Sequence, residues 1–357
     1  MQKRFIRQSI CAKVAVFQII TIFACFIPKC IKMNFRKIII TTTLILGVIA
    51  CKKEDEDTIN PGLDGYLTIK GLPEFVAPGE SVTLTPTGVS HPDGEAISYT
   101  WRVLPSKPET FSGETFNFTF TDTLQTCTIY CSAAAEGYTS SSASNYVTVV
   151  KGGKDGSIKG IDFPSSSFDT EDATYYYKQI GAQTWLVNNV AERDWGKAYR
   201  NTDVMSDVLG RYYSFEEAVI ACQSLSTSEM TWALPTKEDW EEMAAYVKEQ
   251  ITADSSLGKT VASSLMADAT FNTNQMWKYR PAVGDITNAS GLSAIPAGYS
   301  NLMTSSFAGV YEYATFWTNS AEGTEANVAY LILDQPNINF QKLDKESFGA
   351  SVRCIRK

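Results

Sequence analysis

The sequence predicts an α+β chain of two folded domains, an all-β sandwich followed by an α+β domain. Between residues 65 and 150, short runs alternate apolar and polar residues with the period of two that is typical of half-buried strands. Between residues 209 and 247, apolar residues instead recur at three- and four-residue steps, which indicates two amphipathic helices. The Gly-rich stretch 151–159 lies between these patterns and is typical of a linker. We therefore expect domains at residues 65–150 and 160–357.

The first domain is expected to be a β-sandwich because turn signals such as Pro78-Gly79 and Asp93-Gly94 separate its strand-like runs. These runs cover residues 66–69, 81–84, 98–103, 116–120, 127–131 and 146–149. The stretch from His91-Pro92-Asp93-Gly94 to Tyr99-Thr100-Trp101 resembles the PKD (polycystic-kidney-disease-type) branch of immunoglobulin-like domains. That resemblance implies that Trp101 is the core tryptophan.

Cys127 and Cys131 are predicted to be buried thiols of this sandwich. On a strand they would share one face but lie about 13 Å apart, which is too far for a disulfide. A metal site at this pair would need further ligands, and the single histidine of the chain, His91, belongs to a turn. We therefore expect no metal site at these residues.

Each predicted helix carries a capping signal at its start. Ser214 precedes the first helix and Glu217 follows three residues later, so each side chain can bond the free backbone N–H of the other residue. Thr236 caps the second helix, and Asp239 lies in its first turn near the positive end of the helix dipole. The apolar periodicity of the first helix turns Cys222 toward the core.

Residues 175–357 resemble a known family through six motifs in the expected order. The motifs are QIGAQTWL (179–186), GRYY (210–213), WALP (232–235), GLSAIPAGY (291–299), FWT (316–318) and FGASVRC (348–354). Together they resemble the Fibrobacter succinogenes major paralogous domain family.

A helix that bears Cys222 and a terminal strand that bears Cys354 also resemble the C-type lectin-like fold, in which a disulfide ties the first helix to the last strand. The resemblance implies a C-type lectin-like α+β domain at residues 160–357 and a bond between these two cysteines. Secretion would allow the oxidation. In the chain-entropy model, a bond that closes so long a loop stabilises the fold by on the order of 4–5 kcal/mol.

The N-terminal segment predicts a lipid-anchored protein. A basic and then apolar stretch begins at Met33, and it ends in Val48-Ile49-Ala50-Cys51, which resembles the lipobox of bacterial lipoproteins and implies that Cys51 carries the lipid. We expect residues 1–32 to be an upstream extension, residues 33–50 a signal peptide, and residues 51–64 an acidic tether. The tether resembles the signals that send lipoproteins of Bacteroidetes-type bacteria to the outer face of the outer membrane. A signal anchor with Cys51 as an ordinary thiol is the alternative.

The charge balance argues against two classes of partner. The chain contains 31 Lys and Arg residues and 39 Asp and Glu residues. Residues 1–50 hold eight of the basic residues and none of the acidic ones, so the remainder carries 23 against 39, a net charge of −16. Such an acidic chain does not attract nucleic acid or anionic lipid. We therefore expect contact with a membrane through the lipid anchor only.

The sequence offers no constellation of catalytic residues. No Gly-rich phosphate loop or Ser-centred elbow occurs, and the single histidine lies outside the C-terminal domain. The stretch LPTKEDWE (234–241) resembles the LPTEAEWE segment of the formylglycine-generating enzymes, but those enzymes work through active-site cysteines. Here Cys222 and Cys354 are the only cysteines of the C-terminal domain, and both are expected in a structural bond. We therefore expect a binding protein without a cofactor rather than an enzyme.

The candidate ligand-binding residues lie between residues 271 and 340, a region with many aromatic and asparagine residues and no obvious core period. Aromatic faces stack on sugar rings and amides pair with hydroxyls, so this composition favours a glycan site. We expect the ligand to contact Trp277, Tyr311, Tyr313 and Asn319. Tyr299 and Trp317 stand within family motifs and are expected in the core instead.

The calcium site of sugar-binding C-type lectins is not reproduced. Those lectins place an EPN- or QPD-type triplet before a WND-type triplet, whereas here Gln335-Pro336-Asn337 follows Trp317-Thr318-Asn319. Only Asp334 and Asn337 remain as candidate calcium ligands. Two functions stay open: a cell-surface lipoprotein that binds glycan or polysaccharide, and an adhesin or structural subunit that binds a surface protein. An exposed row of aromatic rings would favour glycan, and a broad apolar patch would favour protein.

Overall fold

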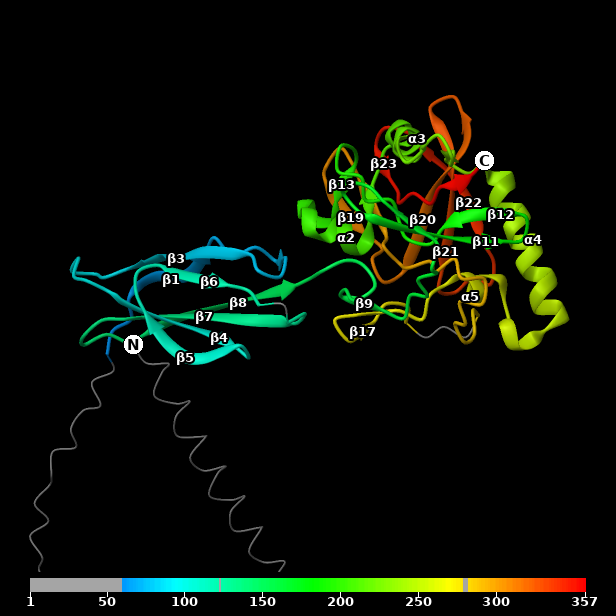
Figure 1. The fold of residues 1–357 in the computed structure, drawn as a ribbon. Coiled ribbons are helices and arrows are strands. Elements are labelled where there is room, and N and C mark those ends of the chain that lie inside the picture. The colour runs from blue at the N-terminus through cyan, green and yellow to red at the C-terminus, as the bar shows by residue number, and fades with distance from the viewer. Residues whose placement is uncertain (1–59, 122, 279–281) are drawn as a thin grey trace, which may run out of the picture. The chain divides into compact units, whose positions relative to one another are not determined.

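The computed structural model describes residues 60–121, 123–278 and 282–357 (Figure 1). The predicted signal peptide, the predicted lipid attachment at Cys51 and the predicted tether up to residue 59 lie outside these residues. Strands make up 41% of the residues that the structure describes and helices 15%, so this part of the protein is mostly β, and the described helices all follow residue 198. Within the described ranges, no helix is long and apolar enough to cross a membrane.

Residues 64–149 form two sheets, as the predicted sandwich requires (Figure 1). The strands are β1 (Asp64–Lys70), β2 (Phe75–Val76), β3 (Ser81–Ser90), β4 (Ser98–Leu104), β5 (Lys107–Ser112), β6 (Phe116–Thr119), β7 (Thr126–Ala134) and β8 (Ser141–Val149). One sheet has the order β1-β3-β6 and the other β2-β8-β7-β4-β5. Six of these strands overlap the predicted runs, whereas the sequence reasoning missed β2 and β5.

The sandwich core contains the tryptophan that the PKD resemblance implies and the buried thiols that the strand pattern predicts. Trp101 is 1% exposed, and its indole N–H donates to the Gly113 carbonyl oxygen at 3.0 Å, so the expected core tryptophan is confirmed. Cys127 and Cys131 are free and buried, also as predicted. His91 lies in a turn, where its Nδ1 accepts a hydrogen bond from the backbone N–H two residues on, at 3.1 Å.

The C-terminal domain consists of short strands and a few helices (Figure 1). The strands are β9 (Ile158–Lys159), β10 (Ser167–Asp169), β11 (Thr174–Ile180), β12 (Gln183–Leu186), β13 (Lys197–Ala198), β14 (Arg211–Tyr212), β15 (Trp232–Ala233), β16 (Thr270–Phe271), β17 (Asn274–Gln275), β18 (Tyr299–Asn301), β19 (Ser306–Ala308), β20 (Tyr313–Glu322), β21 (Glu325–Ile332), β22 (Asn339–Asp344), β23 (Phe348–Gly349) and β24 (Ile355–Arg356). The α-helices are α2 (Ser206–Leu209), α3 (Phe215–Ser224), α4 (Lys237–Ala253) and α5 (Val261–Leu265), and the 3-10 helices are η1 (Tyr199–Asn201), η2 (Asp203–Met205) and η3 (Ser255–Leu257).

A five-stranded sheet joins the beginning of this domain to its end. Its order is β10-β11-β12-β24-β15, and β12 meets β24 where Trp185 lies opposite Ile355. The remaining sheets have the orders β20-β21-β22, β19-β18-β23, β17-β16-β9 and β13-β14. The three-stranded sheet β20-β21-β22 carries the candidate site described below.

The Gly-rich stretch between the domains has more order than its composition predicts. The backbone N–H of Ser157 donates to the Lys151 carbonyl oxygen at 2.7 Å, and the Ser157 hydroxyl oxygen accepts from the Lys151 N–H at 3.0 Å. Two residues of the stretch form β9, which pairs with β16 of the C-terminal domain. Regular structure of that domain therefore begins at Ile158, slightly before the expected Gly160.

Both capping predictions are confirmed. At the start of α3, the Ser214 N–H donates to Glu217 Oε2 at 2.8 Å, and the Glu217 N–H donates to Ser214 Oγ at 3.4 Å. At the start of α4, the Thr236 N–H donates to Asp239 Oδ2 at 2.8 Å, and the Asp239 N–H donates to Thr236 Oγ1 at 3.1 Å. Each helix thus begins at the residue that follows its cap.

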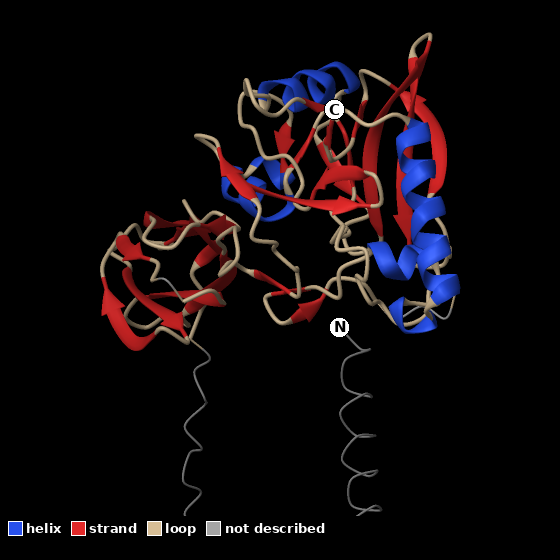
Figure 2. Ribbon diagram, turned by 45° about the vertical axis from the view of Figure 1, so that its right-hand side comes forward, coloured by secondary structure: helices blue, strands red, loops and turns tan. Residues whose placement is uncertain are grey.

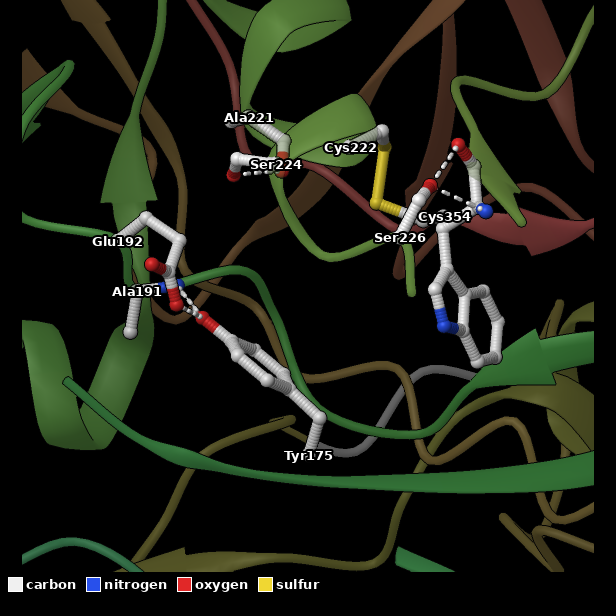
Figure 3. Close-up of a disulfide and its surroundings, with 9 residues drawn as sticks. Tyr175, Ala191, Glu192, Ala221, Cys222, Ser224, Ser226 and Cys354 are labelled. Carbon is white, nitrogen blue, oxygen red and sulfur yellow. Dashed lines mark hydrogen bonds between the residues drawn. A yellow bond between two sulfur atoms is a disulfide. The ribbon is translucent and has the colours of Figure 1, made fainter. Parts of the chain in front are cut away.

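The predicted disulfide is confirmed as well. Figure 3 shows Cys222 of α3 bonded to Cys354, with a distance of 5.6 Å between the two Cα atoms. Cys354 directly precedes β24 and accepts a backbone hydrogen bond from Leu186 at 3.0 Å. The bond therefore fastens α3 to the sheet that holds the chain end.

The long helix α4 covers one face of the sheet β20-β21-β22 (Figure 2). Trp240 of α4 stacks on Phe316 of β20, with ring centroids 5.2 Å apart. Met243 and Val247, one and two turns further along the helix, are buried in the same core. This packing leaves the opposite face of the sheet to the groove described next.

Candidate binding groove

The candidate site lies on the face of the sheet β20-β21-β22 that α4 does not cover. The register places Thr315 of β20 opposite Tyr330 of β21, and Tyr330 opposite Asn339 of β22. Side chains alternate between the two faces of a strand, so these three project away from the face that holds Phe316. Tyrosine, threonine and asparagine on neighbouring strands therefore meet on one surface.

This surface forms a groove with a volume of about 570 Å³, which is within the range of about 300–1,000 Å³ found for ligand sites. The groove is lined by Tyr299, Tyr313, Thr315, Val328, Tyr330, Ile332, Asp334, Gln335, Asn339, Gln341, Leu343 and Phe348. We name it the tyrosine groove after its three tyrosines. The strands β18 and β23 bring Tyr299 and Phe348 to the wall of the groove.

The aromatic rings of the tyrosine groove form a continuous row. Tyr330 lies 6.3 Å from Tyr313, Tyr313 lies 5.8 Å from Tyr299, and Tyr299 lies 5.5 Å from Phe348, measured between ring centroids. All four side chains are neither buried nor fully exposed. Each ring is therefore held by a neighbouring ring and keeps part of its surface for a ligand.

A glycine allows two of these rings to approach the backbone. Gly309 has φ of +70°, a conformation that costs little only for glycine. A Cβ atom at this position would stand 2.9 Å from Tyr299 Cε1 and 2.9 Å from Tyr313 Cδ2. The position of both rings thus depends on the absence of a side chain at residue 309.

One buried hydroxyl in the tyrosine groove has no hydrogen-bond partner. Thr315 is 4% exposed, and its Oγ1 makes no hydrogen bond to any residue that the structure describes. An unsatisfied buried polar group costs on the order of 1–3 kcal/mol. Buried polar groups in folded proteins almost always have a partner, so this hydroxyl requires an explanation.

The polar character of the groove comes mainly from uncharged groups. Gln335, Asn339 and Gln341 supply amides, and Asp334 is the one charged residue among the lining residues that the structure describes. The pKa of the Tyr313 phenol is raised, first by partial burial and then by neighbours that include Tyr299, Glu312 and Asp334. A phenol is neutral at neutral pH even at its ordinary pKa of about 10, so Tyr313 can donate its hydrogen.

Of the four predicted ligand-binding residues, the structure places Tyr313 alone in the tyrosine groove. The prediction for Trp277 is wrong: its side chain is 1% exposed, and its indole N–H donates to the Ala294 carbonyl oxygen at 3.1 Å, which makes it a core residue. Tyr311 is half-buried and packs against another part of the core. Asn319 is exposed, and its backbone N–H donates to the Pro235 carbonyl oxygen at 2.7 Å, outside the groove lining.

Sequence reasoning missed Tyr299, Thr315 and Tyr330 as groove residues. The expectation of a core position is correct for Trp317, which is fully buried, but wrong for Tyr299, which is partly exposed in the groove wall. A usable signal is the period of two along 313–317, which places Tyr313, Thr315 and Trp317 on one face of a strand. Nothing in the sequence shows that this face lies beside Tyr299.

Another cavity of the C-terminal domain, about 520 Å³ in volume, is lined in part by carboxylates. Two of them are engaged by one guanidinium, since Arg193 Nη2 lies 2.8 Å from Asp207 Oδ1 and Arg193 Nε lies 3.8 Å from Asp172 Oδ1. Over residues 60–121, 123–278 and 282–357, no three His, Cys, Asp or Glu side chains gather in the manner of metal ligands. The tyrosine groove therefore remains the stronger candidate.

Comparison with known proteins identifies the C-terminal domain. The family model described as the Fibrobacter succinogenes major domain matches residues 179–356. No curated protein matched the sequence.

Two solved structures show distant similarity. The PKD domain of the human VPS10 domain-containing receptor SorCS2 has 15% identity and a TM-score of 0.19, and the match covers 34% of this chain and 94% of that one. The Yersinia pseudotuberculosis adhesin InvE has 9% identity and a TM-score of 0.22, and the match covers 82% of this chain and 70% of that one. The family match, together with the motifs along residues 179–356, leads to one identification. The chain carries a Fibrobacter succinogenes major domain at residues 179–356.

Proposed function

We propose that this protein is a non-catalytic, cell-surface binding protein that holds a polysaccharide in its tyrosine groove. The observation that carries the proposal is the buried Thr315 hydroxyl, which has no partner among the described residues and belongs to a residue of a groove lined by partly exposed tyrosine rings. The oxygen itself is covered, so a ligand hydroxyl would supply the missing hydrogen bond once a neighbouring side chain of the groove moves aside. A buried hydroxyl without a hydrogen bond is costly, and a bound sugar would remove that cost.

The lining suits a sugar in two further respects. A pyranose ring has apolar C–H faces, and the row from Tyr330 through Tyr313 to Tyr299 offers aromatic surface against which such faces stack. The rim of a sugar carries hydroxyls that both donate and accept hydrogen bonds, as do the side-chain amides of Asn339 and Gln341. A polymer with repeated rings could occupy more than one position along the row.

The cell-surface location in this proposal is supported by the lipobox-like sequence before Cys51 and by the acidic residues after it. The disulfide Cys222–Cys354 also fits an oxidising compartment. We further propose that the C-terminal domain has a C-type lectin-like frame, supported by the disulfide between α3 and the segment before the last strand. In this arrangement the sandwich separates the binding domain from the lipid anchor.

The proposal is tested by a glycan array probed with the purified full chain, alongside the variant Tyr313→Ala. We expect binding to at least one polysaccharide by the wild-type chain. Loss of one stacking ring and of its support for Tyr299 should weaken that binding by roughly tenfold, because an aromatic pair alone is worth about 0.5–1.5 kcal/mol beyond its buried area.

The matched control is Tyr66→Ala, which removes a tyrosine that is 88% exposed in the sandwich. It should bind as the wild-type chain does. Absence of binding to every polysaccharide, or equal loss in both variants, would contradict the proposal. In that case the alternative of a protein partner would be the next one to test.

A further inference from the structure

We propose that the tyrosine groove selects uncharged polysaccharides and rejects those that carry carboxylate or sulfate groups. This inference rests on the proposed function and adds the class of sugar that the groove accepts. It follows from the charges that line the groove and from the place of the nearest basic side chains.

The groove lining contains an acid and no base. Asp334 is exposed at the end of β21, and neither Lys nor Arg is among the lining residues that the structure describes. Glu312, also exposed, precedes Tyr313 in the chain and adds to the negative field around that phenol. An anionic sugar in the groove would therefore meet like charge and no counter-charge.

The basic side chains of the surrounding elements have other partners. Lys342 of β22 is hydrogen-bonded to Glu322, and it alternates with Gln341, so it projects from the other face of the sheet. Lys237 Nζ lies 5.0 Å from the ring centroid of Phe340, and Lys345 Nζ lies 5.5 Å from that of Phe215. None of these three lysines is among the described residues that line the tyrosine groove.

Neutral hydrogen-bonding groups complete the selection. Gln335, Asn339, Gln341 and the orphan Thr315 hydroxyl can pair with sugar hydroxyls without leaving a charge unpaired. A carboxylate brought against the aromatic row would lose part of its hydration and gain no salt bridge. The tyrosine groove thus favours hydroxyl-rich, uncharged rings.

The test compares polysaccharides that share one backbone and differ in the group at C6, which is a neutral CH2OH or a charged carboxylate. Galactan, glucomannan and laminarin would each be offered to the purified full chain beside a C6-oxidised form, in which carboxylates replace primary hydroxyls along the same backbone. We expect the oxidised form to bind at least about tenfold more weakly than its parent at low salt, and the ratio to shrink as added salt screens the repulsion. In the variant Asp334→Asn, the ratio of the affinity for the parent to the affinity for the oxidised form should fall toward one, by about threefold or more.

The control for this variant is Glu249→Gln, which removes the same charge from the exposed side of α4 and should leave the ratio as in the wild-type chain. An oxidised form that binds as tightly as its parent would overturn the charge selection and leave the proposed function intact. Binding to oxidised forms alone would do the same. Binding to no polysaccharide of either kind would overturn the proposed function, and the selection with it.

Discussion

The ring of Tyr313 meets the ring of Tyr299 edge-on, with centroids 5.8 Å apart and planes at 85°. Gly309 makes this arrangement possible, since a Cβ there would stand 2.9 Å from an atom of each ring. We predict that Gly309→Ala displaces both rings and weakens polysaccharide binding by roughly tenfold or more, through the loss of stacking surface. Isothermal titration calorimetry with a polysaccharide that the wild-type chain binds would measure the change in affinity.

Gly323 provides the matched control for this variant. It also has a positive φ, of +57°, but a Cβ there would meet nothing within 4 Å. Both Gly309→Ala and Gly323→Ala should therefore lower the free energy of unfolding by about 1 kcal/mol through backbone strain. Only Gly309→Ala should also bind polysaccharide more weakly. Equal affinities in the two variants would show that the position of the rings does not matter for binding.

The disulfide Cys222–Cys354 is predicted to be the largest single stabilising element of the C-terminal domain. It spans 132 residues, so in the chain-entropy model its removal in the variant Cys222→Ala/Cys354→Ala costs about 5 kcal/mol. Guanidinium unfolding of the variant and the wild-type chain would measure this difference.

The same bond makes a chemical prediction. In the unfolded chain without reductant, Cys127 and Cys131 should be alkylated, whereas Cys222 and Cys354 should react only after reduction. Peptide mapping by mass spectrometry separates the two pairs. Alkylated Cys222 in unreduced protein would contradict the bond.

The first turn of α4 predicts a loss of stability in acid. Burial alone would raise the pKa of Asp239, but hydrogen bonds from Lys357 Nζ at 2.9 Å and from Thr236 more than offset it, so the pKa is lowered. A carboxylate with a lowered folded pKa contributes stability above its unfolded pKa of about 3.9, and this contribution is lost as the pH falls through the folded pKa.

We therefore predict that Asp239→Asn is less stable than the wild-type chain at neutral pH and that the difference shrinks below about pH 4. Urea unfolding of both proteins at several pH values would measure this difference in the free energy of unfolding. Glu249→Gln on the exposed side of α4 is the control and should shift stability little. A difference for Asp239→Asn that is constant with pH would mean that its charge plays no part.

Local patterns in the sequence account for most of the predictions that the structure confirms. A helix cap needs only a side chain and a backbone N–H three residues apart, so Ser214 with Glu217 could be found from spacing alone. The period of two is equally local, and it located six strands of the sandwich, whereas the core position of Trp101 was implied by the PKD resemblance. The disulfide has no local signal across 132 residues, and it was predicted only through the resemblance to a family.

The tyrosine groove could not be predicted in this way because long-range pairing creates it. Thr315 meets Tyr330 through the register of β20 on β21, and Tyr299 joins them from β18. Composition alone singled out Trp277, which packs in the core and donates its indole N–H to the Ala294 carbonyl oxygen, seventeen residues away. Aromatic richness thus indicated the right region but could not separate core residues from groove residues.

The orphan hydroxyl of Thr315 allows the most direct test of the account, because its roles in folding and in binding should separate. Thr315→Val removes the unsatisfied group while keeping the shape of the side chain, and Thr315→Ser keeps the hydroxyl. We predict that Thr315→Val is as stable as the wild-type chain or up to about 2 kcal/mol more stable.

The decisive measurement is the affinity of Thr315→Val for a polysaccharide that the wild-type chain binds, determined together with its free energy of unfolding. The account predicts unchanged or increased stability with affinity lowered by about three- to tenfold, and with binding retained in Thr315→Ser. Lowered stability with unchanged affinity would contradict it, because the hydroxyl would then serve the fold rather than a ligand in the tyrosine groove.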